Sequence, residues 1–202
     1  MSALLDVQRN RRQRCSTYNY LQPLSCQPAS GGVPLTWRSR PLFFGAAALV
    51  ALLDQVTKHI VSTGMPLHSS IPVVDGLFNI TYVRNPGAAF GFLATAPVYF
   101  RVVFFITVTV AAILLILYYL RRYGFDDWKL ALALSLIMGG AVGNLIDRIR
   151  FGDVVDFFDV YIGPHHWPAF NVADSAISIG AVLLITGMVG RSRRGSDSVT
   201  SG

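Results

Sequence analysis

The chain has 202 residues, of which 52% are hydrophobic and only 14% are charged. Ordinary soluble domains carry about 25% charged residues, so this composition excludes an ordinary soluble protein and indicates one compact integral membrane unit. The basic residues behind the formal net charge of +6 cluster at the chain ends and beside apolar runs. Orientation in a membrane explains that placement, and a nucleic-acid partner is not expected.

The first part of the chain, residues 1–40, is rich in Arg, Ser, Gln and Pro. Such a composition is typical of disorder, and we expect a basic cytoplasmic arm. The apolar run at 41–61 is too long for the core of a cleaved signal peptide and lacks a clear cleavage site. It is long enough to span a bilayer, which takes about 20 residues.

Three further apolar runs predict membrane spans at 97–120, 130–149 and 169–189. Arginines precede the first span and follow the second and the fourth. The positive-inside rule therefore places both termini in the cytoplasm. We predict a membrane all-α fold in which four transmembrane helices form a domain over 41–190, while residues 191–202 form a cytoplasmic tail.

Two loops are expected on the outer face of the membrane. The loop 63–96 contains the segment 77–83, whose β-branched and aromatic residues predict a strand. Asn85 and Gly87 belong to a turn signal after that strand. We therefore expect a small extracytoplasmic β element. The second outer loop is expected over 150–169.

The strongest candidates for chemistry are two aspartates at the edges of the last two spans. Asp156 follows the third span and Asp174 lies in the first turn of the fourth. Placing a carboxylate at the edge of a bilayer costs free energy. Such residues therefore occur mainly where they are paired or where they have a function. Of two facing carboxylates, the ionised one can deprotonate water while the protonated one polarises a carbonyl. The alternative is that each caps a helix or pairs with an arginine.

Polar residues at helical spacing accompany both aspartates. Asn144, Asp147 and Arg148 are spaced i, i+3 and i+4 and share a helical face. Asn171 stands three residues before Asp174. Polar stripes on two adjoining spans indicate a built site. We expect Asp147 to brace the structure, and Arg148 either to hold substrate carbonyls or to pair elsewhere.

Two other polar groups leave alternatives open. Asp54 and Lys58 form an i, i+4 pair near the end of the first span, which fits either mutual neutralisation or a positioning role. Asn85 either donates to a substrate backbone or stabilises its own turn. His165 and His166 are adjacent and no HExxH helix is present, so a zinc peptidase is not expected.

The same acids also fit a protein of another class, a small proton-coupled membrane carrier. Its relay would consist of Asp54, Lys58, Asp156 and Asp174. A carrier places its acids near the middle of the bilayer and shows an internal repeat. Here the acids lie at one edge and the two halves show no repeat, which favours hydrolysis.

Five segments occur in order along the apolar part of the chain. They are Asp-Gln-Val-Thr-Lys (54–58), Val-Arg-Asn-Pro-Gly-Ala-Ala-Phe-Gly (83–91), Gly-Asn-Leu-Ile-Asp-Arg (143–148), Val-Val-Asp-Phe (154–157) and Phe-Asn-Val-Ala-Asp-Ser (170–175). Together they resemble the lipoprotein signal peptidase family, also called signal peptidase II. The likeness runs from about residue 41 to residue 190 and leaves out the N-terminal arm.

The resemblance implies an aspartic endopeptidase of the bacterial inner membrane, with its active site on the extracytoplasmic face. Its partners would be the bilayer and prolipoprotein signal peptides, cut before a cysteine that carries diacylglycerol. No metal or organic cofactor is implied, and we expect a monomer.

The resemblance also implies roles for individual residues, by match of motif. The catalytic pair would be Asp156 and Asp174. Substrate binding or support of the pair would fall to Asn85, Asn144, Arg148 and Asn171. Structural or positioning roles would fall to Asp54, Lys58, Asp147 and Gly87.

Overall fold

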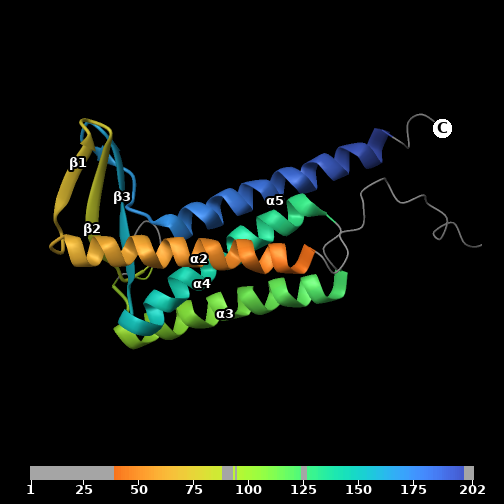
Figure 1. The fold of residues 1–202 in the computed structure, drawn as a ribbon, viewed down its shortest axis with the longest axis horizontal. Coiled ribbons are helices and arrows are strands. Elements are labelled where there is room, and N and C mark those ends of the chain that lie inside the picture. Colours follow the sequence, from red (N-terminus) through yellow and green to blue (C-terminus); the bar gives the residue numbers. More distant parts are fainter. Residues whose placement is uncertain (1–38, 88–92, 94, 124–126, 198–202) are drawn as a thin grey trace, which may run out of the picture. The chain divides into compact units, whose positions relative to one another are not determined.

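The structure, a computed structural model, describes residues 39–87, 93, 95–123 and 127–197. Its elements follow one another in the order α2, β1, β2, α3, α4, β3, β4 and α5. Figure 1 shows the sheet at one end of the helices. The predicted N-terminal arm lies outside the described residues, except for its last two, which begin α2.

Four helices carry the four apolar runs. They are α2 (Ser39–Gly64), α3 (Val98–Tyr123), α4 (Trp128–Phe151) and α5 (Val172–Asp197). Within the described residues, α2, α3 and α4 each contain a stretch long and apolar enough to cross a membrane, whereas α5 has the shorter apolar stretch Val172–Gly187. The helices are therefore confirmed at all four places. That α5 also spans the membrane stays a prediction.

An antiparallel sheet forms from the segments between the helices. Its strands are β1 (Ser70–Val74), β2 (Phe78–Asn85), β3 (Val154–Ile162) and β4 (His165–His166), and they lie side by side in that order. The strand predicted at 77–83 is confirmed as β2. Much of the segment expected as an outer loop, 150–169, is instead β3. It is a strand because its β-branched and aromatic residues pair with β2.

A glycine in the left-handed region joins α4 to β3. Gly152 has φ 79°, and its N–H donates to the carbonyl oxygen of Arg148 at 3.0 Å. Glycine takes this conformation without the strain that a Cβ brings. The chain therefore leaves the helix and enters β3 within a few residues, which places Asp156 close to the end of α4.

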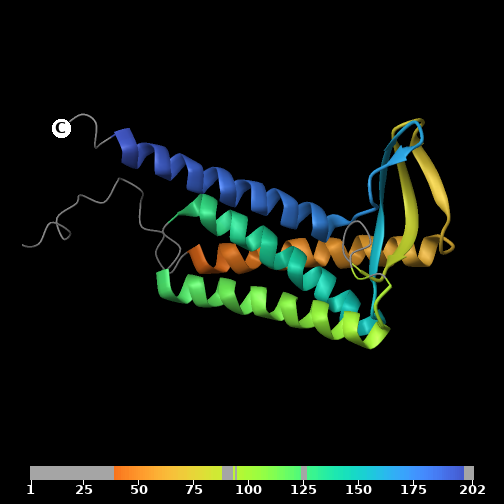
Figure 2. The ribbon, with the colours of Figure 1, turned by 180° about the vertical axis from the view of Figure 1, so that it is seen from behind.

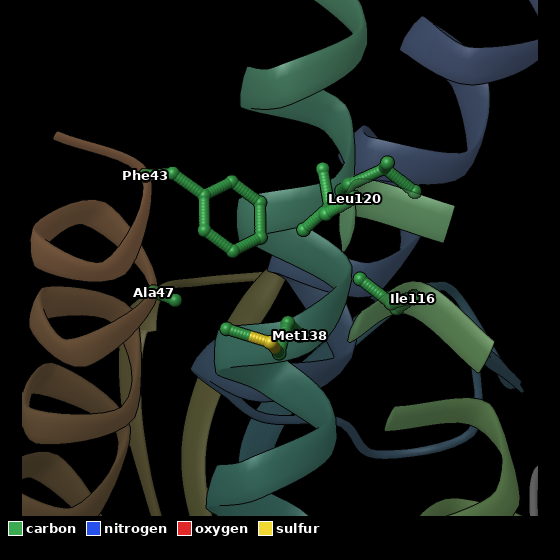
Figure 3. Close-up of a cluster of buried hydrophobic side chains, with 6 residues drawn as sticks. Phe43, Ala47, Ile116, Leu120 and Met138 are labelled. Atoms are coloured by element: carbon green, nitrogen blue, oxygen red, sulfur yellow. The ribbon is translucent and has the colours of Figure 1, made fainter. Parts of the chain in front are cut away.

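Helix α4 packs against the other three helices, and Figure 2 shows it running between α5 and α3. One apolar cluster joins α2, α3 and α4, and Figure 3 shows Phe43 of α2 pointing towards α4 within it. A second cluster joins the end of α2 to the sheet. It consists of Val61, Tyr82, Val155 and Phe157. Because it includes the residues on both sides of Asp156, it fixes the position of that aspartate.

Small residues allow α4 to approach its neighbours closely. A Cβ built on Gly140 would collide with the carbonyl oxygen of Ala173 and lie 2.8 Å from Cγ1 of Ile177. Such overpacking costs about 1–3 kcal/mol. We therefore expect Gly140→Ala to lower the thermal unfolding midpoint of the purified protein in detergent, measured by circular dichroism.

The matched control is Gly45→Ala in α2, because a Cβ at Gly45 would meet no atom within 4 Å. Alanine is favoured over glycine inside a helix by about 0.5–1 kcal/mol, so this variant is expected to unfold at the same temperature or slightly higher. Equal midpoints for the two variants would contradict the close packing of α4 on α5.

Candidate active site

Asp156 lies on β3 and is 1% exposed. Each of its carboxylate oxygens accepts a hydrogen bond from a side-chain amide. Asn85 of β2 donates to Oδ2 through Nδ2 at 2.9 Å, and Asn171 donates to Oδ1 through Nδ2 at 2.7 Å. The carboxylate is therefore held in one orientation by neutral donors from both sides.

Asp174 lies in the first turn of α5 and is half-buried. Its backbone N–H donates to Oδ1 of Asn171 at 2.9 Å, so Asn171 acts as the cap of the helix. From α4, Nδ2 of Asn144 donates to Oδ1 of Asp174 at 2.8 Å. Asn171 also donates through Nδ2 to Oδ1 of Asn144 at 3.3 Å. The two asparagines thus bridge the two aspartates.

The environment of Asp156 changes its acidity. Burial, followed by the negative charge of Asp174, raises the pKa of Asp156 from its ordinary 3.8 to about 7. Hydrogen bonds from Asn85 and Asn171 and the charge of Lys58 oppose that rise. Near neutral pH, Asp156 therefore exists in both protonation states. A side chain that transfers protons needs this property.

A buried network centred on Lys58 lies next to the two aspartates. The ammonium group, in a residue only 3% exposed, is 2.8 Å from Oδ2 of Asp54 and 2.9 Å from Oδ2 of Asp147. It also donates to Oδ1 of Asn144 at 2.9 Å. An ammonium group has three donors, and all three have partners here. The pairing of Asp54 with Lys58 is thus present, and Asp147 shares the same ammonium group; that Asp147 has a structural role stays a prediction.

The same network holds the two chain segments that carry the aspartates. The backbone N–H of Val155, just before the aspartate of β3, donates to Oδ2 of Asp147 at 3.1 Å. The backbone N–H of Ala173, just before the aspartate of α5, donates to Oδ1 of Asp54 at 2.9 Å. Residues of α2 and α4 therefore position both carboxylates through the adjacent backbone.

Gln55 belongs to this network and was not singled out from the sequence. Its Nε2 lies 2.9 Å from Oδ1 of Asp147, 3.1 Å from the carbonyl oxygen of Gly143 and 3.3 Å from Oδ2 of Asp54. The sequence did contain a signal for Gln55: it is an amide next to Asp54 within an apolar span. Polar residues inside a membrane span are usually hydrogen-bonded to other polar groups.

Arg148 points towards the turn that follows β2. Its Nη2 donates to the carbonyl oxygen of Gly87 at 3.3 Å, and its guanidinium lies 4.7 Å from the ring centre of Phe105. Oδ1 of Asn85 accepts from the N–H of Gly87 at 3.0 Å. Asn85 therefore contacts its own turn and donates to Asp156 as well, and a contact with the substrate backbone stays a prediction. Among the described residues, Arg148 has no ion-pair partner within 4.0 Å.

A cavity of about 520 Å³ opens beside these groups, a size typical of ligand sites. The predicted site residues that line it are Asn85, Gly87, Asn144, Arg148, Asp156 and Asp174. The other four, Asp54, Lys58, Asp147 and Asn171, are buried in the hydrogen-bond networks behind it. Sequence reasoning missed the rest of the wall, which consists of Val154, residues 167–170, Ser175 and residues 177–179.

No cluster of three or more His, Cys, Asp or Glu side chains suited to a metal ion occurs in the part of the chain that the structure describes. His166 instead has its Nδ1 2.8 Å from Oδ1 of Asp159, on the sheet. Nδ2 of Asn79 donates to the other oxygen of the same carboxylate at 3.0 Å.

Comparison with known proteins identifies close relatives. The family described as signal peptidase (SPase) II matches residues 46–190. The lipoprotein signal peptidase of Syntrophus aciditrophicus is 56% identical over 155 residues, covering 77% of this chain and 96% of that protein. That of Geobacter sulfurreducens is 53% identical over 152 residues, covering 75% and 94%.

Two solved structures have a similar fold. Both are described as a bacterial membrane enzyme determined by the in meso method, at 2.3 Å and 1.9 Å resolution. The first has a TM-score of 0.69 at 35% identity and covers 76% of this chain and 90% of its own. The second has a TM-score of 0.67 at 34% identity and covers 74% and 93%.

These matches, together with the apolar helices, define a membrane-embedded aspartic endopeptidase. Enzymes of this class are hydrolases, and this assignment replaces the hypothesis of a proton-coupled carrier. The chain belongs to the signal peptidase II family, the lipoprotein signal peptidases, which remove signal peptides from prolipoproteins in the membrane.

Proposed function

We propose that this enzyme cuts prolipoproteins just before a diacylglyceryl-modified cysteine, with a water molecule activated between Asp156 and Asp174. The observation that carries the proposal is that both carboxylates line one cavity and are bridged by Asn144 and Asn171. Such an arrangement holds two acids with different environments, which favours different protonation states and different roles.

The two environments suggest which aspartate does what. Asp174 is half-buried and its Oδ2 accepts no hydrogen bond from the described residues, so it takes a proton from the water that attacks the scissile carbonyl carbon. Asp156, buried and with a pKa of about 7, gives its proton to the carbonyl oxygen. The tetrahedral intermediate then collapses: one of its hydroxyl groups returns a proton to Asp156, the C–N bond breaks, and the proton held by Asp174 passes to the leaving amine of the cysteine.

Substrate position follows from the rest of the cavity wall. Arg148 forms no ion pair within 4.0 Å among the described residues, and we assign it to hold a carbonyl oxygen of the extended peptide. Apolar residues of α5, Ile177 and Ile179, form one side of the cavity. Ile179 is 55% exposed, so this side suits the apolar part of a substrate that remains in the bilayer. Holding the lipid part would position the scissile bond by proximity.

The proposed setting is the bacterial inner membrane, with four spans and both termini in the cytoplasm. The arginines in the last turn of α3, Arg121 and Arg122, then lie at the cytoplasmic end. The sheet, the two aspartates and the cavity lie at the extracytoplasmic end. This orientation follows the positive-inside rule, and it places the cleavage point where a translocated signal peptide ends. The expectation of a monomer stays a prediction.

The lipid requirement is tested with two forms of one prolipoprotein peptide, with and without diacylglycerol on the cysteine. Purified enzyme in detergent is expected to cleave the modified form and to leave the unmodified form almost intact, because the lipid positions the scissile bond. Cleavage products are followed by mass. Equal kcat/KM for both forms would contradict the requirement for lipid, while leaving the peptidase activity itself established.

The pH dependence of cleavage follows from the raised pKa of Asp156. The proposed cycle needs Asp156 protonated, and its proton leaves as the pH rises through about 7. We therefore expect kcat/KM to fall above about pH 7, approaching tenfold per pH unit. Rates are measured between about pH 5.5 and 9 with a substrate that has no group titrating in that range. A rate that stays level up to pH 9 would contradict this role for Asp156.

A further inference from the structure

Two arginines outside the cavity share one aromatic ring. The guanidinium carbon of Arg84, on β2, lies 4.4 Å from the ring centre of Phe151, and that of Arg150 lies 5.0 Å from the same centre. Both distances are within the range of cation–π attraction. Nε of Arg84 also donates to the hydroxyl of Tyr82 at 3.2 Å. The ring and the hydroxyl hold the two cations in place without neutralising them.

Neither charge is balanced by an acid in the described part of the chain. The ion pairs there involve Lys58 and His166, and neither Arg84 nor Arg150 has a carboxylate oxygen within 4.0 Å. In the orientation proposed above, on which this step rests, the positive-inside rule does not account for these two arginines, because it favours arginine at the opposite, cytoplasmic end of the helices. Two guanidinium groups that contact one ring, and that have no carboxylate partner among the described residues, indicate a site for an anion.

The position of the pair indicates which anion. Arg150 lies in the last turn of α4 between Ile149, 65% exposed, and Phe151, 46% exposed. Exposed apolar residues at the end of a membrane helix face lipid, and an arginine among them extends its charged group to the headgroup level. A phospholipid has both a phosphate, which the arginines can bind, and acyl chains, which the exposed apolar residues can contact. A water-soluble acidic peptide has no part that needs these apolar residues.

We propose that Arg84 and Arg150, held on Phe151, bind the phosphodiester of an anionic phospholipid headgroup. The guanidinium fork matches phosphate oxygens in a two-point contact. Both arginines are close in sequence to residues that line the cavity: Arg84 precedes Asn85, which donates to Asp156, and Arg150 follows Arg148 by two residues. A bound lipid therefore fixes the parts of β2 and α4 that support the active centre.

The test is native mass spectrometry of the full-length protein in detergent, titrated with phosphatidylglycerol or with phosphatidylcholine. The double variant Arg84→Gln/Arg150→Gln is expected to bind phosphatidylglycerol about tenfold more weakly, as the loss of charged hydrogen bonds predicts. Its binding of phosphatidylcholine is expected not to change. The control, Arg121→Gln/Arg122→Gln, also removes two positive charges, but from the last turn of α3. It is expected to weaken the binding of phosphatidylglycerol less.

Phosphatidylglycerol affinity equal to that of the unaltered protein in Arg84→Gln/Arg150→Gln would overturn the proposal, and so would an equal loss in the control pair. Phe151→Leu tests the same site with both charges kept, and it is expected to weaken binding because the ring holds the guanidinium groups; unchanged affinity would again overturn the proposal. Displacement of the lipid by equimolar glycerol phosphate would show a site for free phosphate instead. Displacement by an equimolar acidic peptide would show a peptide site.

Discussion

Asp174→Asn is expected to abolish prolipoprotein cleavage, with kcat/KM lower by about 10²–10⁴-fold, because an amide cannot take the proton of the attacking water. The substitution keeps an Oδ1 atom that accepts from Asn144, so the surrounding structure is preserved. Asp156→Asn is expected to have an effect of similar size, because it removes the proton donor. Since the two groups act as a unit, the double variant should be no slower than either single variant. Cleavage of the lipidated substrate is measured at saturating and limiting concentrations.

The matched control for the aspartate variants is Asp159→Asn. This residue lies on the same strand, three positions beyond Asp156, and contacts Asn79 and His166. Because it does not line the cavity, its replacement is expected to leave kcat/KM near that of the unaltered enzyme. Normal cleavage by Asp174→Asn would remove Asp174 from the mechanism. A large loss in Asp159→Asn would show that the sheet, and not the cavity, is sensitive to the lost charge.

Lys58→Met is expected to lower the free energy of unfolding by about 3–5 kcal/mol. The variant leaves two carboxylates, Asp54 at 0% and Asp147 at 1% exposure, in the protein interior without a cation. It also frees Oδ1 of Asn144, so the amide that donates to Asp174 loses its restraint. Stability is measured by denaturant unfolding of the purified protein in mixed micelles, followed by circular dichroism.

Two comparisons separate the buried charge from a general effect of losing a lysine. Lys129→Met removes an exposed lysine at the start of α4 and is expected to change the free energy of unfolding by about 0.5 kcal/mol or less. Lys58→Met/Asp147→Asn removes one of the uncompensated charges and is expected to recover part of the loss. If Lys58→Met were as stable as Lys129→Met, the network would not be a source of stability.

The helices and most of the polar site could be predicted from the sequence because they rest on local patterns. Apolar runs long enough to span a bilayer give α2, α3 and α4 directly. The i, i+3 and i, i+4 spacings of Asn144, Asp147 and Arg148 fix a common helical face, and the structure brings all three to the same end of α4. The turn at Asn85 was also visible from residue types alone.

The rest depended on contacts between distant parts of the chain. β3 is recognisable only once β2 is present as its partner, since a short run of β-branched and aromatic residues next to a helix end also fits a loop. The contacts of Lys58 with Asp147 and Asn144 of α4, and those of Gln55 with the same helix, require the helices to be placed against each other. Residues 167–170 line the cavity because Phe170 pairs with Phe158 of β3. The spacing of residues in the sequence does not predict this pairing.

The bond between Asp54 and the backbone of Ala173 joins residues 119 positions apart, and this separation matters during synthesis. At the pace of translation, on the order of ten seconds pass between the appearance of the two residues. Throughout that interval the first helix already carries a buried acid without its final partner. Lys58, one turn away, is the cation that can neutralise it at once. The ion pair therefore acts before the active centre has formed. By neutralising Asp54, it stabilises α2 in the membrane until α5 has been synthesised and completes the site.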